Sequence, residues 1–373
     1  MTLSPERSSA KDKLKYPFFS FSSMKNLIPL LLIFGIFTAS INILADETSD
    51  PVVWKSKINS WVPFVTTTND GSYTGASSLD GSFYILNNKG EVLWTNKPGH
   101  RVTHISFSDD LSRVSVITGE RAYVYTIDGK PLESYKSVKG GFMDITPDEK
   151  YIGGSSSNVY AMVYEDGRPS WDYKTDGKVN DISLTPDGKT LGVASSDNFV
   201  YLVRSGFLLW KKDLKAPVIS VEVTPDSSFV VCGTGSFESE EGEKNFKLYL
   251  FDGSGNLLWS KVIGHTVSSV SITPDGSLIA IGSWDKKAHV FSNKGEPLKE
   301  FSTNGNVWSV SITPDGKNLV IGSTDTYVYF LDVDSMQKHQ RMSSSINPMY
   351  VAIPILIILA AGAFIYTKKI KKK

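Results

Sequence analysis

One short segment recurs seven times along the chain, and this repeat restricts the fold more than any other feature. Each copy is an alternating apolar run that ends in a tight turn built around an aspartate. Successive turn aspartates are 40, 38, 39, 39, 49 and 40 residues apart. The seven are Asp70, Asp110, Asp148, Asp187, Asp226, Asp275 and Asp315.

Four strands fit within one repeat, and the sixth copy shows the pattern most clearly. Val267–Thr273 is the expected innermost strand, and residues 274–276 form the turn after it. Leu278–Ser283 and Ala288–Ser292 follow as the second and third strands, and a further turn leads to an outer fourth strand. Seven such sheets at a period near 40 residues predict an all-β fold, in which residues 46–334 form a seven-bladed β-propeller.

Part of this pattern resembles a WD repeat. In the sixth copy, Gly-His at 264–265 precedes the inner strand, a Pro-Asp-Gly turn follows it, and Ser-Trp-Asp at 283–285 ends the second strand. The resemblance assigns histidines such as His265 a structural hydrogen bond towards positions such as Asp285. Phe291 and Phe330 stand where WD repeats carry a third-strand Trp, which is a departure from that family.

Another part resembles the quinoprotein-like (PQQ-like) repeat, in which an outer-strand Trp docks between blades. Residues 249–259 carry it as Tyr-Leu-Phe-Asp-Gly-Ser-Gly-Asn-Leu-Leu-Trp. The same Gly-x-x-x-Trp spacing occurs at Gly90 and Trp94, Gly167 and Trp171, Gly206 and Trp210, and Gly255 and Trp259. Blades two and six depart from it, with Glu133 and Lys299 at the Trp position. The two resemblances together cover nearly all of residues 51–334.

The last repeat lacks an outer strand, because it ends at Asp332. A candidate lies at the other end of the domain, where Pro51–Ile58 resembles the outer-strand segment 257–263. We expect Val52–Ile58 to pair with Tyr327–Asp332 and so to close the ring. Closure by an N-terminal strand removes an exposed sheet edge.

Two apolar segments flank the repeats. Residues 1–45 read as an N-terminal extension with a signal peptide or signal anchor, whose apolar part is Leu27–Ala45. A polar linker at 335–348 precedes a predicted transmembrane helix at 349–367, which is close to the length needed to cross a bilayer. The basic tail at 368–373 is expected to stay in the cytoplasm. Since both flanks are basic, the sequence predicts a membrane-anchored propeller at the cell surface, outside the cytoplasm.

The charges are divided unevenly along the chain, although Lys plus Arg and Asp plus Glu both total 39. The repeat region is acidic and both ends are basic. An acidic domain without clustered cations is a poor nucleic-acid binder, so we expect no nucleic-acid partner.

The sequence carries no recognisable catalytic constellation. Its five histidines lie outside metal-binding spacings, and it has no nucleophile elbow and no phosphate loop. Cys232 is the one cysteine and sits in an apolar run, where a buried, inert thiol is expected. Quinone enzymes of the PQQ-like family usually carry adjacent cysteines and calcium ligands. We therefore predict no catalytic, cofactor-binding or metal-binding residues, and we interpret the Asp-Gly-Ser-Gly turn at 252–255 as capped by its own side chain rather than by Ca²⁺.

The binding site is predicted on the upper face of the ring, which carries the loops before each inner strand. Equivalent inner-strand positions at the mouth of the central channel are expected to hold an aromatic-rich rim, and a longer loop in blade five adds one exposed aromatic residue. The candidate binding residues are Phe64, His104, Phe142, Asp181, Phe237 and Trp308. Deeper positions are interpreted as solvated channel lining, and they are Thr66, Ser106, Asp144, Ser183, Glu222, Ser271 and Ser311.

These observations favour a non-catalytic interaction or recognition scaffold. The expected partner is a protein or polymer at the outward face, with the membrane reached through the C-terminal helix and the propeller acting as a monomer. Two alternatives remain open: an envelope assembly or chaperone-like factor, and, ranked last, a PQQ-dependent dehydrogenase-like enzyme.

Overall fold

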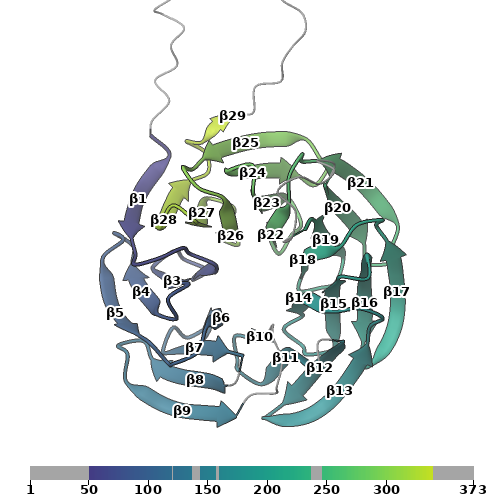
Figure 1. Cartoon of the computed structure of the whole chain (residues 1–373), viewed down its shortest axis with the longest axis horizontal. Helices are drawn as coiled ribbons and strands as arrows, with labels where there is room; N and C mark the ends of the chain where they lie inside the picture. Colours follow the sequence, from purple (N-terminus) through teal and green to yellow (C-terminus); the bar gives the residue numbers. More distant parts are fainter. Residues whose placement is uncertain (1–49, 120, 137–142, 157–158, 237–245, 339–373) are drawn as a thin grey trace, which may run out of the picture. The chain divides into compact units, whose positions relative to one another are not determined.

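Seven antiparallel sheets surround a common axis in the computed structural model, which describes residues 50–119, 121–136, 143–156, 159–236 and 246–338 (Figure 1). Blades one to three contain β2 (Val65–Thr67), β3 (Tyr73–Ser77), β4 (Phe83–Asn87), β5 (Val92–Asn96); β6 (Val102–Phe107), β7 (Arg113–Thr118), β8 (Arg121–Thr126), β9 (Pro131–Lys136); and β10 (Met143–Ile145), β11 (Tyr151–Ser156), β12 (Tyr160–Glu165), β13 (Arg168–Lys174). The predicted all-β, seven-bladed fold is confirmed.

The remaining blades follow the same order from the axis outwards. They contain β14 (Val179–Leu184), β15 (Thr190–Ser195), β16 (Phe199–Arg204), β17 (Phe207–Asp213); β18 (Val218–Val223), β19 (Phe229–Thr234), β20 (Lys247–Asp252), β21 (Leu257–Val262); β22 (Val267–Ile272), β23 (Leu278–Ser283), β24 (Lys287–Ser292), β25 (Pro297–Ser302); and β26 (Val307–Ile312), β27 (Asn318–Ser323), β28 (Tyr327–Asp332). Among these described residues, no helix has the length and apolar character needed to cross a membrane. The predicted signal segment and transmembrane helix lie outside the described residues.

The repeated aspartate turns form because one carboxylate satisfies two donors. In all seven, the Thr or Ser two residues before the aspartate donates its hydroxyl to Oδ1, at 2.5–2.9 Å. The backbone N–H two residues after the aspartate donates to the same atom, at 2.9–3.1 Å. This side-chain turn, which Asp favours, joins each inner strand to the second strand.

Four outer strands are fastened by a Trp that packs on a Gly of the next blade: Trp54 on Gly90, Trp94 on Gly129, Trp210 on Gly255 and Trp259 on Gly295. Trp94 lies against Gly129, and its Nε1 donates to the carbonyl oxygen of Ile127 at 2.8 Å. Trp210 lies against Gly255 and donates to Gly253, 3.0 Å away. These glycines have positive φ, and a Cβ at Gly255 would fall 2.8 Å from the Trp210 ring, so both the turn and the ring require glycine.

Blades two and six show what happens without that Trp. Gly167, which follows the blade that carries Glu133, has no described atom within 4 Å of its would-be Cβ. In blade six, Lys299 Nζ instead donates to the carbonyl oxygens of Asp334 and Met336. Among the described side chains, no indole covers Gly167, and a lysine takes the place of the Trp in blade six.

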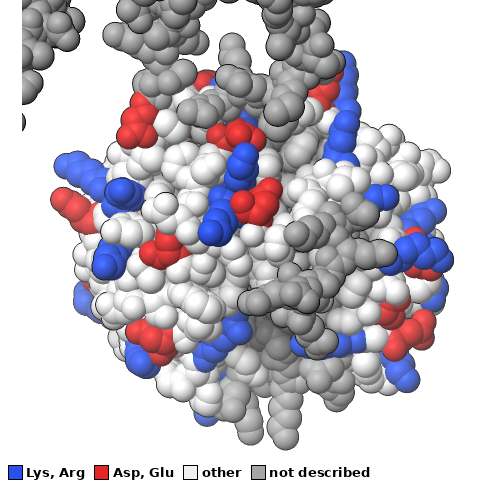
Figure 2. Space-filling view, turned by 45° about the horizontal axis from the view of Figure 1, so that its top comes forward, with Lys and Arg blue, Asp and Glu red and all other residues white. Residues whose placement is uncertain are grey.

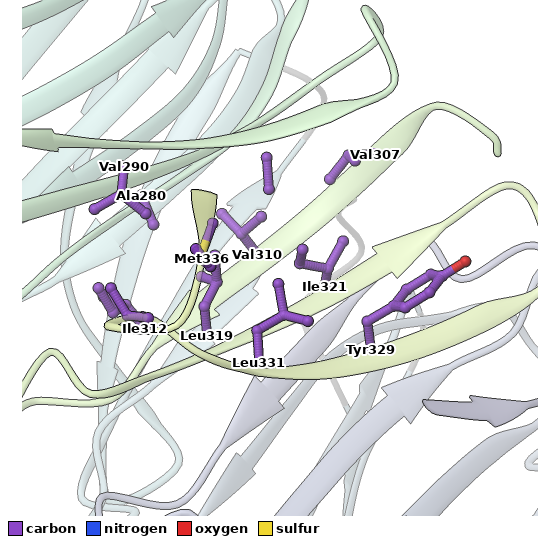
Figure 3. Close-up of a cluster of buried hydrophobic side chains, with 12 residues drawn as sticks. Ala280, Val290, Val307, Val310, Ile312, Leu319, Ile321, Tyr329, Leu331 and Met336 are labelled. Atoms are coloured by element: carbon purple, nitrogen blue, oxygen red, sulfur yellow. The ribbon is translucent and has the colours of Figure 1, made fainter. Parts of the chain in front are cut away.

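The core lies between neighbouring blades. Figure 3 shows one interface, where Ala280 and Val290 of blade six face Val310 and Leu331 of blade seven, with Met336 at the edge. All five are under one-tenth exposed. Since each sheet buries both faces only against its neighbours, one blade has little core of its own.

The two ends of the described chain both join the outer side of the last blades (Figure 1). Strand β1 (Val52–Lys57) pairs antiparallel with β28, with Trp54 opposite Phe330. Beyond β28, Met336 is buried, and the two-residue strand β29 (Gln337–Lys338) pairs with β25 as a fifth strand of blade six. The first residues of the segment that the sequence predicts to be a linker thus lie along this blade.

Candidate binding face at the ring axis

The inner strands present their upper ends at one face of the ring, and two aromatic pairs lie there. Trp61, in the segment before β2, contacts Trp308 of β26 edge to face, with ring centroids 5.5 Å apart. Phe64 packs on His104 of β6, with centroids 4.6 Å apart. The backbone N–H of Val65 donates to Ser309 Oγ at 3.1 Å. This bond joins blade one, which carries Phe64, to blade seven, which carries Trp308.

Of the predicted rim residues, the structure brings Phe64 and His104 together and places Asp181 in β14, two blades further on. Phe142 and Phe237 lie outside the described residues. Trp61 was not predicted, although a Trp three residues before Phe64 is a signal that the sequence contains. Its side chain is 45% exposed, and it is more exposed than Phe64, His104 or Trp308.

Trp308 is not equivalent to the other rim positions. Counting back from the turn aspartates makes Ser309 the counterpart of Phe64. Trp308 is instead the extra residue of a β-bulge between Val307 and Ser309, and the same bulge recurs at this place in blades two, four, five and six. Because the bulge turns the extra residue sideways, Trp308 meets Trp61. The interpretation of Trp308 as an equivalent position was therefore wrong, although it does lie at this face.

Three acidic side chains follow the aromatic pairs around the axis on consecutive inner strands. Asp144 Oδ2 accepts the backbone N–H of Leu184 at 2.8 Å. Asp181 Oδ2 accepts the N–H of Val221 at 3.0 Å, and Glu222 Oε2 accepts that of Ile272 at 3.2 Å.

Serines make the same kind of bond at the other junctions, and this changes the interpretation of the inner positions. Ser183 accepts from Val223 at 3.1 Å, and Ser271 accepts from Ile312 at 3.3 Å. Inner strands are sheet edges whose outward N–H groups need acceptors. The polar side chains of one blade supply them to the next, so solvated lining is an incomplete description of Asp144, Ser183, Glu222 and Ser271.

Partial burial shifts the pKa values of the three acidic side chains and of His104. Desolvation raises the pKa of Asp181 to about 7 and that of Glu222 to about 8, against the opposing effect of their backbone hydrogen bonds. The negative charge of Asp144 raises both further. Desolvation also raises the pKa of Asp144, whereas it lowers that of His104, whose Nε2 lies 3.6 Å from Asp144 Oδ1.

The described residues give little support to metal binding or to catalysis by a thiol. Within them, no three His, Cys, Asp or Glu side chains form a group that could hold a metal ion. Asp252 caps its own turn by accepting the N–H groups of Ser254 and Asn256. Cys232 is fully buried, and desolvation raises the pKa of its thiol, which is the opposite of what an activated nucleophile requires.

The histidine that pairs with Asp285 is not the one expected from the WD-repeat resemblance. Asp285 Oδ2 pairs with His289 Nε2 at 2.8 Å, whereas His265 Nδ1 accepts the N–H of Thr266. The same position in blade seven uses a tyrosine, where Tyr329 donates its hydroxyl to Asp325 at 2.8 Å. The partner of the aspartate therefore comes from the third strand of its own blade, and the expected bond from His265 was wrong.

Comparison with known proteins gives one family match. Residues 256–292 and 295–332 match the family model described as WD domain, G-beta repeat. These two windows cover blade six, most of blade seven and the outer strand of blade five. No curated protein matches the chain.

Proposed function

We propose that this seven-bladed β-propeller with WD40 repeats is a non-catalytic scaffold that binds a protein or polymer partner at its upper face. WD40 propellers commonly bind proteins. The observation that carries the proposal is the group formed by Trp61, Trp308, Phe64 and His104 at the upper ends of the inner strands. Exposed aromatic side chains held in fixed positions supply much of the binding energy in protein interfaces.

The propeller is proposed to act outside the cytoplasm, as a monomer held at the membrane. Support for this comes from the sequence alone, from the apolar segment at 349–367 and the basic tail at 368–373. Strand β1 begins at Val52, which pairs with Leu331 at the end of β28 that lies away from the upper face, so the proposed membrane side is the lower face of the ring. The upper face would then remain free to meet a partner.

Site-specific photocrosslinking in intact membranes tests this proposal. A photoreactive residue replaces Trp61 in one variant and Leu132, which is half-exposed on outer strand β9, in a matched control. We expect a discrete crosslinked partner at position 61 and none at 132, and we expect Trp308→Ala to weaken that crosslink. Equal labelling from both positions would show that the upper face is not the binding face.

A second candidate function is an envelope assembly factor, and the Trp-on-Gly packing favours it. The pairs Trp94 with Gly129 and Trp210 with Gly255 have the outer-strand docking found in quinoprotein-like propellers, some of which serve in assembly. The same crosslinking experiment separates the two functions. Membrane-assembly machinery in the product supports the assembly factor, whereas surface or secreted proteins support the scaffold.

A further inference from the structure

Three carboxyl groups lie on consecutive inner strands, in blades three, four and five, and are called here the acidic row. Asp144 reaches β14, the strand that carries Asp181, through the N–H of Leu184. Asp181 reaches β18 through the N–H of Val221, the neighbour of Glu222. The acidic row therefore extends from His104, which lies beside Asp144, to the junction with blade six, where Glu222 binds the N–H of Ile272.

The described residues supply this row with very little positive charge. None of the ion pairs among them pairs a Lys or Arg with Asp144, Asp181 or Glu222. His104 is the one basic side chain paired with the row, and its lowered pKa favours the neutral imidazole. Asp144, Asp181 and Glu222 are partly buried, and a partly buried carboxylate without a cation is costly because water solvates its charge incompletely.

A buried hydroxyl without a partner lies within the same row. Ser220 is 3% exposed, and its Oγ has no hydrogen-bond partner among the described residues. It stands two residues before Glu222 on β18, on the same side of the strand, and it adjoins Val221, whose N–H is bound to Asp181. A buried polar atom that is left unpaired indicates a missing donor or acceptor at this point.

The approach to the row is aromatic. His104 contacts both Phe64 and Asp144, so the aromatic group and the acidic row meet at this residue. The side chain of Asp144 is 22% exposed, so a ligand at the axis has access to it. An arginine guanidinium stacks on aromatic faces, donates several hydrogen bonds and pairs with carboxylates, and it therefore matches all three features.

We propose that this row is the binding site for a cationic side chain of the partner, an arginine or a lysine, which enters past the aromatic group and is held by Asp181, Glu222 and Ser220. This inference rests on the proposed function, because it names the chemistry that the upper face recognises. The raised pKa values of Asp181 and Glu222 agree with it, since carboxyls that lack a cation hold their protons at neutral pH.

The test uses the full chain in detergent and a pair of labelled peptides. One peptide contains two arginines, and the other has the uncharged analogue citrulline at both positions. We expect fluorescence anisotropy to show at least tenfold tighter binding of the arginine peptide. We expect that preference to disappear in the double variant Asp181→Asn and Glu222→Gln, which keeps the backbone acceptors and nearly the same volume.

A second double variant controls for net charge. Asp166→Asn and Asp172→Asn remove two acids from an outer hairpin of blade three, where both side chains are exposed, and should leave the preference intact. Proton release on binding near pH 7.5 is a further expected result, because a bound cation lowers the pKa of Asp181 and Glu222. If the Asp181→Asn and Glu222→Gln variant is unstable, Ser220→Ala replaces it in the test and should weaken arginine binding a few-fold.

The outcomes separate this inference from the proposed function. Equal affinity for both peptides, no binding of either, or equal loss in the control variant overturns the cation site. If the partner still crosslinks at position 61 in that case, the scaffold function stands and only the identity of the recognised group is wrong. If that crosslink is absent while arginine binding is retained, the proposed partner face is wrong and the cation site stands.

Discussion

Replacing Trp54 with alanine tests whether strand β1 holds the ring closed. Trp54 is 8% exposed, stacks on Phe330 with ring centroids 5.2 Å apart, and covers Gly90 of the next blade. Its Nε1 has no acceptor among the described residues, so the substitution removes packing and no hydrogen bond.

The expected loss follows from that packing. A buried aromatic side chain removes about 150–250 Å² from water, and truncating a buried Trp to Ala typically lowers the free energy of unfolding by about 3–5 kcal/mol. For a domain of this size the same loss lowers Tm by about 5–10 °C. Differential scanning calorimetry of the full chain measures it directly.

Trp61→Ala is the matched control, because Trp61 is also a Trp but is half-exposed and lies outside the β1–β28 pair. Its removal should lower Tm by no more than about 2 °C, since surface substitutions change stability by a few tenths of a kcal/mol. If Trp54→Ala lowers Tm no further than Trp61→Ala does, β1 is not part of the ring's stability, and the closure argument fails.

Three further predictions concern the turn glycine Gly255, the carboxyl groups of Asp181 and Glu222, and the thiol of Cys232. Gly255→Ala should destabilise the propeller by about 2–4 kcal/mol in chemical denaturation, because a Cβ would clash with Trp210 at a positive φ, whereas Gly167→Ala, which meets open space, should cost only about 1 kcal/mol of backbone strain. The folded-state pKa values of Asp181 and Glu222 exceed their unfolded values, so the folded protein binds more protons and stability should fall as pH rises from about 4 to about 8. That slope, measured as Tm against pH, should be smaller in the Asp181→Asn and Glu222→Gln variant; an unchanged slope would show that these two groups do not cause it. Cys232 should react with a thiol reagent only after denaturation, and rapid labelling of the native protein would contradict its burial.

The blade count and strand order followed from the sequence because the aspartate turn is a local structure. Its Thr or Ser, its Asp and its following N–H are close neighbours in the chain, so the spacing alone reveals them. The Gly-x-x-x-Trp spacing indicated an outer-strand Trp that docks between blades, but the glycine of the next blade on which Trp94 and Trp210 pack was found only in the structure. Each of these features repeats, and repetition makes a short pattern reliable.

The candidate site was harder to predict because it depends on contacts between blades. Nothing near Asp181 in the sequence shows that its carboxylate binds the N–H of Val221, forty residues away. Trp308 lies seven residues before its turn aspartate, whereas the other rim positions lie six before theirs, so the sequence spacing already separates it from them. The bulge that brings Trp308 to Trp61 became visible only in the structure. The pairing of β29 with β25 involves two residues without a strand pattern, so it too became visible only in the structure.

The Trp-on-Gly packing at the rim has a mechanical consequence. Trp54, Trp94, Trp210 and Trp259 each cover a glycine of the following blade, so an indole bridges four of the outer junctions. Drawing two of these blades apart would expose the indole between them to water, and the loss of that burial resists opening at the rim as well as at the axis.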